Sequence, residues 1–180
     1  MKNLNLNLPN ILAAFRVLLA PLMLWFMVDQ SNPVFDGWHP SWFDYFAGLI
    51  FVIASVTDFF DGYIARSWDQ MTKLGGILDP LADKMLVLAG FIGLIVLDRA
   101  SAFAVFLILS REFFITGLRV VAISEGKNVA STMAGKIKTV VQMIAIGFLI
   151  MDWPYGSELL WFAVALTLYS GYEYIRDYLK

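Results

Sequence analysis

The sequence lacks cysteine altogether and contains a single histidine, His39. Without cysteine the chain forms no disulfides and offers no thiolate ligands to a metal ion. His39 has no other metal-ligating residue beside it, so we interpret it as a surface residue of a loop. Disulfide scaffolds and thiolate metal centres are therefore excluded.

Charge is also scarce, since charged residues make up 16% of the 180 residues and hydrophobic residues 59%. Soluble domains usually carry about 25% charged residues. The apolar residues fall in long runs between short polar breaks, and about 20 mostly apolar residues suffice to cross a bilayer. The sequence predicts an all-α polytopic membrane protein, a single domain over 1–180 with a short interfacial segment over 1–9 and six transmembrane helices at roughly 11–28, 43–65, 80–97, 102–124, 137–151 and 157–175.

Positive charge is almost absent from one predicted side of the membrane. With six spans, all but one of the 13 Lys and Arg residues lie in or lean toward the side that carries both chain ends, and Arg99 is the exception. Cytoplasmic loops of membrane proteins carry an excess of Lys and Arg. We therefore expect both termini, and the loop over 67–78, on the cytoplasmic face of the inner membrane.

Four aspartates occupy the ends of two predicted spans: Asp58, Asp61, Asp79 and Asp83. A charged side chain at a bilayer centre costs about 2.5–3.5 kcal/mol, so these must face water, a metal or a cationic partner. Within each pair the spacing is i,i+3 or i,i+4, which places both carboxylates on one helix face. Two antiparallel helices would bring the pairs together, and such oxygen ligands suit Mg²⁺ or Mn²⁺, where two ions about 3.5–4 Å apart serve phosphoryl chemistry.

Small residues accompany the aspartates and would let a bulky ligand approach the backbone: Gly62, Ala65, Gly75 and Gly76. We expect Gly75 and Gly76 in the loop between the two helices, and Pro80 in the first turn of the second helix. Arg66 offers a planar fork for phosphate. The alternative is that individual aspartates are merely solvated or paired with nearby cations, namely Arg66, Lys73 and Lys84.

The complete spacing resembles the signature of the CDP-alcohol phosphotransferases. Its eight defining positions are all present: Asp58, Asp61, Gly62, Ala65, Arg66, Gly75, Asp79 and Asp83. The resemblance extends over essentially the whole chain and implies a six-helix enzyme that transfers a phosphoryl-linked group from a CDP-linked lipid or alcohol to an acceptor hydroxyl, releasing CMP.

The resemblance also implies a role for each position of the signature. Asp58, Asp61 and Asp79, with Asp83 as a further ligand, would hold two Mg²⁺ or Mn²⁺ ions. Asp83 would also be the catalytic base that takes the proton of the acceptor hydroxyl. The CDP moiety would be bound by a larger set: Asp58, Asp61, Gly62, Ala65, Arg66, Gly75 and Asp79.

A second group of charged residues is basic and predicts a site for an acceptor that carries its own phosphate: Arg111, Arg119, Lys136 and Lys138. Arginine gives bidentate and lysine point-charge contacts to phosphate. Arg111 lies deepest and has Glu112 as its acidic neighbour in the sequence, which makes Glu112 a candidate structural partner. The polar stretch EGKNVASTMAGK is expected to form the loop that delivers the two lysines, which are alternatively ordinary cytoplasmic anchors.

Three further stretches, PNILAAFR, REFFITGLR and GKIKT, resemble one branch of the family, the bacterial phosphatidylglycerophosphate synthases. Asn10 and Arg16 match the first-helix pattern of that branch, whereas Ala13 stands where it usually has Thr. The branch implies CDP-diacylglycerol as donor and glycerol 3-phosphate as acceptor. Membrane lipids and a second copy of the chain are the other expected partners, and nucleic acid is not one.

Other interpretations stay open on the sequence alone. Within the enzyme class, serine or inositol phosphate is an alternative acceptor, although serine would leave the basic group unexplained because it has no phosphate. A cation-coupled transporter would also use intramembrane carboxylates. A structural or lipid-binding protein with an inert metal site is the third alternative.

Overall fold

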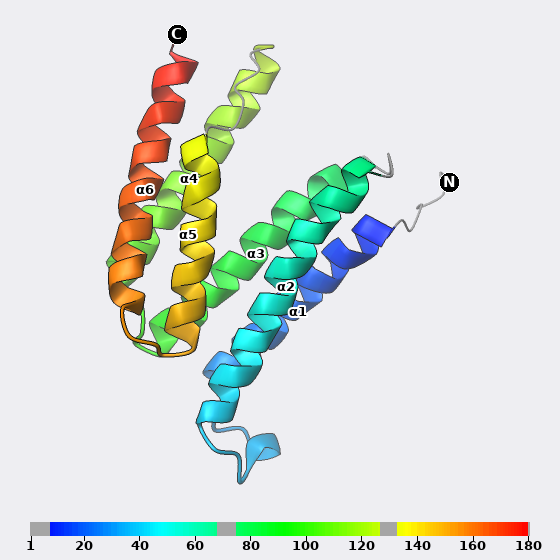
Figure 1. The fold of residues 1–180 in the computed structure, drawn as a ribbon, viewed down its shortest axis with the longest axis vertical. Coiled ribbons are helices and arrows are strands. Elements are labelled where there is room, and N and C mark those ends of the chain that lie inside the picture. The colour runs from blue at the N-terminus through cyan, green and yellow to red at the C-terminus, as the bar shows by residue number, and fades with distance from the viewer. Residues whose placement is uncertain (1–7, 68–74, 127–132, 180) are drawn as a thin grey trace. The chain divides into compact units, whose positions relative to one another are not determined.

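The structure is a computed structural model that describes the backbone of residues 8–67, 75–126 and 133–179, and the side chains of 11–57, 81–126 and 133–179. The described residues form six α-helices and one short 3₁₀ helix (Figure 1). In chain order these are α1 (Leu8–Val28), η1 (Pro33–Phe35), α2 (Ser41–Ser67), α3 (Gly75–Val96), α4 (Ala102–Ser124), α5 (Met133–Ile150) and α6 (Gly156–Tyr178).

The predicted all-α class is confirmed, and each predicted span overlaps one of these helices. Two segments, Ile11–Val28 and Met133–Ile150, are long and apolar enough to cross a membrane by length and composition, among the residues described. The predicted interfacial segment lies almost wholly outside the described residues. The six-span topology stays a prediction.

Two expectations about the start of α3 are wrong. Gly75 and Gly76 belong to α3 and not to the preceding loop, because the helix begins about five residues before the predicted span. Pro80 is consequently the sixth residue of α3, beyond the first turn. Proline has no N–H, so at this position only the bond to the carbonyl of Gly76 is lost, while Ile77 and Leu78 continue the helix before it.

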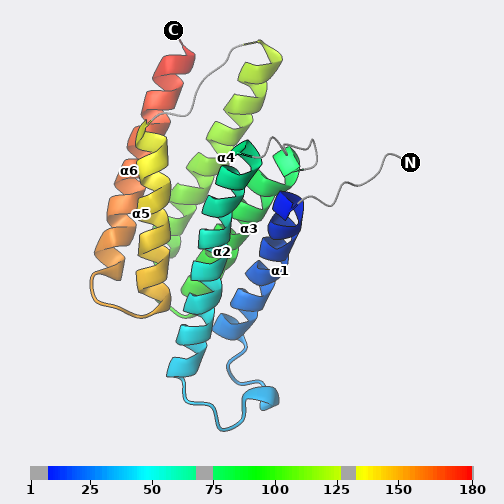
Figure 2. The ribbon, with the colours of Figure 1, turned by 45° about the vertical axis from the view of Figure 1, so that its right-hand side comes forward.

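The chain divides into two compact units, and α1, α2 and α3 form the first. Within it α1 packs against both α2 and α3. It runs antiparallel to α2 and parallel to α3 (Figures 1 and 2). Gly93 of α3 allows a close approach to α1, since a Cβ there would lie 2.7 Å from the sulfur of Met27. The start of α1, the end of α2 and the start of α3 therefore lie at the same end of this unit.

The helices α4, α5 and α6 form the second unit, in which α6 packs against both α4 and α5. The buried side chains between them are mostly apolar, among them Ile108, Ile146 and Leu160. The connection from α5 to α6 is tight, because a Cβ at Gly156 would lie 2.8 Å from a methyl carbon of Leu149. This unit carries all four residues of the predicted acceptor site.

Candidate active site

The four signature aspartates lie at one end of the first unit. Asp58 and Asp61 are nine and six residues before the end of α2, and Asp79 and Asp83 are four and eight residues after the start of α3. The two helices contact each other. At a rise of about 1.5 Å per residue, all four positions fall within about 14 Å of the helix ends that meet there.

Asp83 is the one signature aspartate whose side chain the structure describes, and it is half-buried. No three acidic or histidine side chains form a metal-binding group among those described, a set that does not include Asp58, Asp61 or Asp79. The donor chemistry nevertheless fits the implied metals, because carboxylate oxygens are the ligands of Mg²⁺ and Mn²⁺. The ligand roles of these residues remain predictions.

Arg16 of α1 is wholly buried, with 0% of its surface exposed. It lies eight residues after the start of α1, as Asp83 lies eight residues after the start of α3. Because α1 and α3 run parallel and pack together, both positions are about 12 Å from the same end of the unit. A buried arginine is retained only when its charge is compensated. Along the helix axes, Arg16 lies at the same distance from this end of the unit as Asp83.

In the second unit, Arg111, Glu112 and Lys138 form an ionic cluster between α4 and α5. The Oε1 atom of Glu112 accepts a hydrogen bond from Lys138 Nζ and another from Arg111 Nη1, the latter at 3.3 Å. The side chains of Arg111 and Lys138 are only 12% and 7% exposed. The expected pairing of Arg111 with Glu112 is confirmed, and two of the four predicted acceptor residues are brought together.

The buried face of α6 carries two hydroxyl groups, those of Thr167 and Ser170, among mostly apolar residues. Ser170, at 0% exposure, accepts a hydrogen bond from Arg111 Nη2 at 2.9 Å. Thr167 accepts one from Gln142 of α5 at 2.8 Å and donates to the carbonyl of Ala163 at 2.6 Å. Hydrogen bonds of this kind satisfy buried polar groups that would otherwise be costly. This network was not predictable from the sequence, since Gln142, Thr167 and Ser170 are separated by up to 28 positions.

The other two predicted acceptor residues, Arg119 and Lys136, are exposed. The guanidinium carbon of Arg119 lies 5.9 Å from the ring centroid of Tyr174, a cation–π distance. Further toward the helix ends, the Tyr178 hydroxyl donates to Glu125 at 3.1 Å, which raises the pKa of Tyr178 above its usual value. The structure thus joins α4 to α6 at several levels. Lys136 and Lys138 both lie in α5, so the stretch expected to form the loop that delivers them ends inside this helix.

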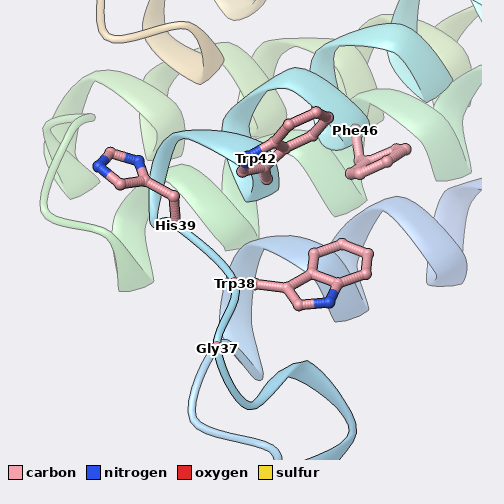
Figure 3. Close-up of a pocket in the computed structure, with 5 residues that line it drawn as sticks. All are labelled: Gly37, Trp38, His39, Trp42 and Phe46. Carbon is pink, nitrogen blue, oxygen red and sulfur yellow. The ribbon is translucent and has the colours of Figure 1, made fainter.

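A pocket of about 370 Å³ lies at the other end of the first unit, between Gly37 and the start of α2. Figure 3 shows its lining of Trp38, Trp42, Phe46 and His39. His39 is exposed, as expected. Among the described residues its walls carry no carboxylate, and its aromatic side chains suit a membrane–water interface.

Comparison with known proteins shows similarity over nearly the whole sequence. Residues 6–169 match the family described as CDP-alcohol phosphatidyltransferase. The chain belongs to this family. The matched range includes the aspartate signature and the basic cluster, and it spans both units of the structure.

Three similar relatives of this CDP-alcohol phosphatidyltransferase share one name, CDP-diacylglycerol–glycerol-3-phosphate 3-phosphatidyltransferase. The protein of Bacillus subtilis is 40% identical, with 93% of each chain covered. That of Rickettsia felis is 36% identical with 94% of each covered. That of Cereibacter sphaeroides is 33% identical, with 98% of this chain and 99% of the relative covered.

Proposed function

We propose that this protein transfers the phosphatidyl group of CDP-diacylglycerol to glycerol 3-phosphate, giving phosphatidylglycerophosphate and CMP in phospholipid synthesis. The observation that carries the proposal is identity of 33–40%, over more than nine-tenths of both chains, to relatives named for this activity. The intact eight-position signature supports the same chemistry.

In this proposal the aspartates serve the reacting phosphate. Asp58, Asp61 and Asp79, with Asp83, would hold two Mg²⁺ or Mn²⁺ ions, which neutralise the pyrophosphate charge when bound. Asp83 accepts the proton of the acceptor hydroxyl. The oxygen of that hydroxyl then bonds to the phosphorus of the phosphatidyl group, and the bond from this phosphorus to the CMP oxygen breaks. The CDP moiety is held by the remaining signature positions, namely Gly62, Ala65, Arg66 and Gly75.

The basic cluster, which consists of Arg111, Arg119, Lys136 and Lys138, binds the acceptor. Arg111 and Lys138 are held together at one carboxylate oxygen, which supports a joint role in binding the phosphate of glycerol 3-phosphate. Arg119 and Lys136, both exposed, add charge that attracts this dianion. Serine has no phosphate and would make no use of these residues.

The proposal includes a membrane arrangement. All six helices span the inner membrane with both termini in the cytoplasm, and residues 1–180 form one domain, because the family match runs through both units. The active site opens to the cytoplasm and to the inner leaflet, where the donor lipid resides. A homodimer is part of the proposal, and the mass of the protein in detergent tests it.

The deciding experiment measures CMP release by the purified protein in detergent with CDP-diacylglycerol and Mg²⁺ or Mn²⁺. Glycerol 3-phosphate, serine and inositol phosphate are supplied separately. We expect release with glycerol 3-phosphate alone. Asp83→Asn should lower kcat by about 10²–10⁴-fold, the usual contribution of a general base. The control is the same substitution at Asp36, which is exposed in the loop between α1 and α2.

Two other outcomes would change the proposal in different ways. Release with serine or inositol phosphate alone would retain the role of the aspartates and overturn the acceptor assignment. No release with any acceptor, from protein shown to be folded, would overturn the enzymatic proposal. Cation flux into vesicles that contain the protein would then favour a transporter.

A further inference from the structure

Glu112 lies between two residues of the basic cluster, Arg111 and Lys138. An acidic residue is unexpected there, because a carboxylate repels a phosphate. One of its oxygens, Oε1, accepts hydrogen bonds from both Lys138 of α5 and Arg111 of α4. Lys138 is 26 positions away in the sequence and belongs to a different helix. A single carboxylate oxygen therefore fixes the relative positions of two cations that two separate helices supply.

These two cations would not stay together without an anion between them. Like charges repel, and the repulsion grows where water is excluded. The side chains of Arg111 and Lys138 are about nine-tenths buried, and that of Glu112 is 25% exposed. A lysine has a long flexible stem that can carry its ammonium group out to water. The bond to Glu112 keeps the ammonium of Lys138 beside the guanidinium of Arg111 instead.

Arg111 is also oriented from the opposite side, by α6. Its Nη2 donates to Ser170, and its side chain packs on Gly171, where a Cβ would lie 3.1 Å from Nε and 3.2 Å from Cγ. Among the described residues, Nε of Arg111 is a buried donor with no hydrogen-bond partner. Glu112 and Ser170 thus take up two of the five N–H donors of the guanidinium, and Nε is among the donors that remain for a ligand.

We propose that Glu112 is a positioning residue of the acceptor site, whose carboxylate holds Arg111 and Lys138 side by side as a prebuilt receptor for a phosphate monoester. The inference rests on the proposed function, because it assigns these two cations to the phosphate of glycerol 3-phosphate. Preorganised charges bind an anion without the cost of collecting them at the moment of binding. Glu112 need not touch the acceptor to have this effect.

The test compares Glu112→Gln, which keeps the shape and removes the charge, with Glu112→Asp, which keeps the charge on a shorter stem. With saturating CDP-diacylglycerol, we expect Glu112→Gln to raise the KM for glycerol 3-phosphate about tenfold, with kcat and the KM for the donor changed less than twofold. Glu112→Asp should recover most of that loss. Glu125→Gln is the matched control, since Glu125 lies on the C-terminal side of α4 and accepts from Tyr178.

Binding is measured separately, as the rise in melting temperature that glycerol 3-phosphate produces without the donor lipid. Glu112→Gln should require about ten times more glycerol 3-phosphate for the same rise. A lower melting temperature with unchanged KM and unchanged binding would overturn the inference, because Glu112 would then be merely structural. A lower KM would overturn it as well, since Glu112 would be competing with the phosphate.

Variants of the cations separate this inference from the proposed function. If Arg111→Ala and Lys138→Met raise the KM for glycerol 3-phosphate and Glu112→Gln does not, the acceptor site stands and the role of Glu112 fails. If none of the three changes that KM, the acceptor site itself is wrong. If the wild-type protein does not use glycerol 3-phosphate, the proposed function fails and the inference with it.

Discussion

Replacing Thr167 by valine should destabilise the second unit through one identifiable group. Valine has nearly the shape of threonine but no hydroxyl, so the 2.8 Å hydrogen bond from the amide nitrogen of Gln142 is lost. Both side chains are buried, at 0% and 4% exposure. A buried donor left without an acceptor costs about 1–3 kcal/mol. Since about 1 kcal/mol shifts the melting temperature of a chain of this size by roughly 2–4 °C, we expect a fall of about 4–8 °C for a loss of about 2 kcal/mol.

The assay is thermal unfolding in detergent, with Gln142→Leu added as the second arm. Replacing both partners by apolar groups removes the unpaired donor, so the double variant should be nearly as stable as the wild type. Thr139→Val is the control, because the Thr139 hydroxyl donates to the backbone of its own helix, at Gly135, and to no other described residue. A double variant that loses as much as the two single variants combined would refute the reasoning, as would an unchanged melting temperature for Thr167→Val.

Three more predictions follow from single contacts. Arg16→Met should cost about 3–5 kcal/mol in unfolding free energy, because it leaves the group that compensates the buried charge without its partner. Arg16→Lys should cost less, and equal melting temperatures for wild type and Arg16→Met would contradict the inferred compensation. Gly171→Ala should raise the KM for glycerol 3-phosphate severalfold, because the new methyl group would lie 3.1 Å from Nε of Arg111. Gly147→Ala is the control and should leave this KM unchanged, because a Cβ there meets nothing within 4 Å. Glu125→Ala removes the carboxylate that accepts the hydrogen bond of Tyr178 and should lower the pKa of Tyr178, measured by ultraviolet titration against Tyr178→Phe. Because this pKa is raised in the folded protein, the hydrogen bond contributes stability below about pH 10 that is lost as the pH rises through the folded pKa.

The helices were predictable because apolar runs between polar breaks define them almost completely. The predicted ends differ from the observed ones where a helix continues through residues that hydropathy treats as breaks. Gly75 begins α3 although glycine favours loops, and Lys136 and Lys138 lie inside α5 although they carry charge. Lys138 is tolerated there because Glu112 compensates its charge, which a hydropathy pattern does not register.

The candidate site was predictable to a different degree in its two parts. The aspartate signature depends on spacing along two helices joined by a short connection, so Asp58 and Asp83 could be assigned to neighbouring helix ends from the sequence. The pairing of Arg111 with Glu112 was also accessible, since the two are adjacent. The contact between Glu112 and Lys138 was not, because it depends on how α4 and α5 are placed around α6. The same holds for the burial of Arg16.

The two buried hydroxyl groups of α6 have a consequence for how the protein assembles in the membrane. In the proposed topology, the hydroxyl groups of Thr167 and Ser170 donate to carbonyls of α6 itself, so α6 satisfies these donors without a neighbour. Gln142 and Arg111 differ, because polar groups in hydrocarbon are unfavourable unless another helix satisfies them. In the folded unit, α5 provides the partner of Thr167 and α4 that of Ser170. The polar side chains of Gln142 and Arg111 therefore gain these acceptors only when α6 has been inserted, so the proposed acceptor site is complete only after the last of the six helices is in place.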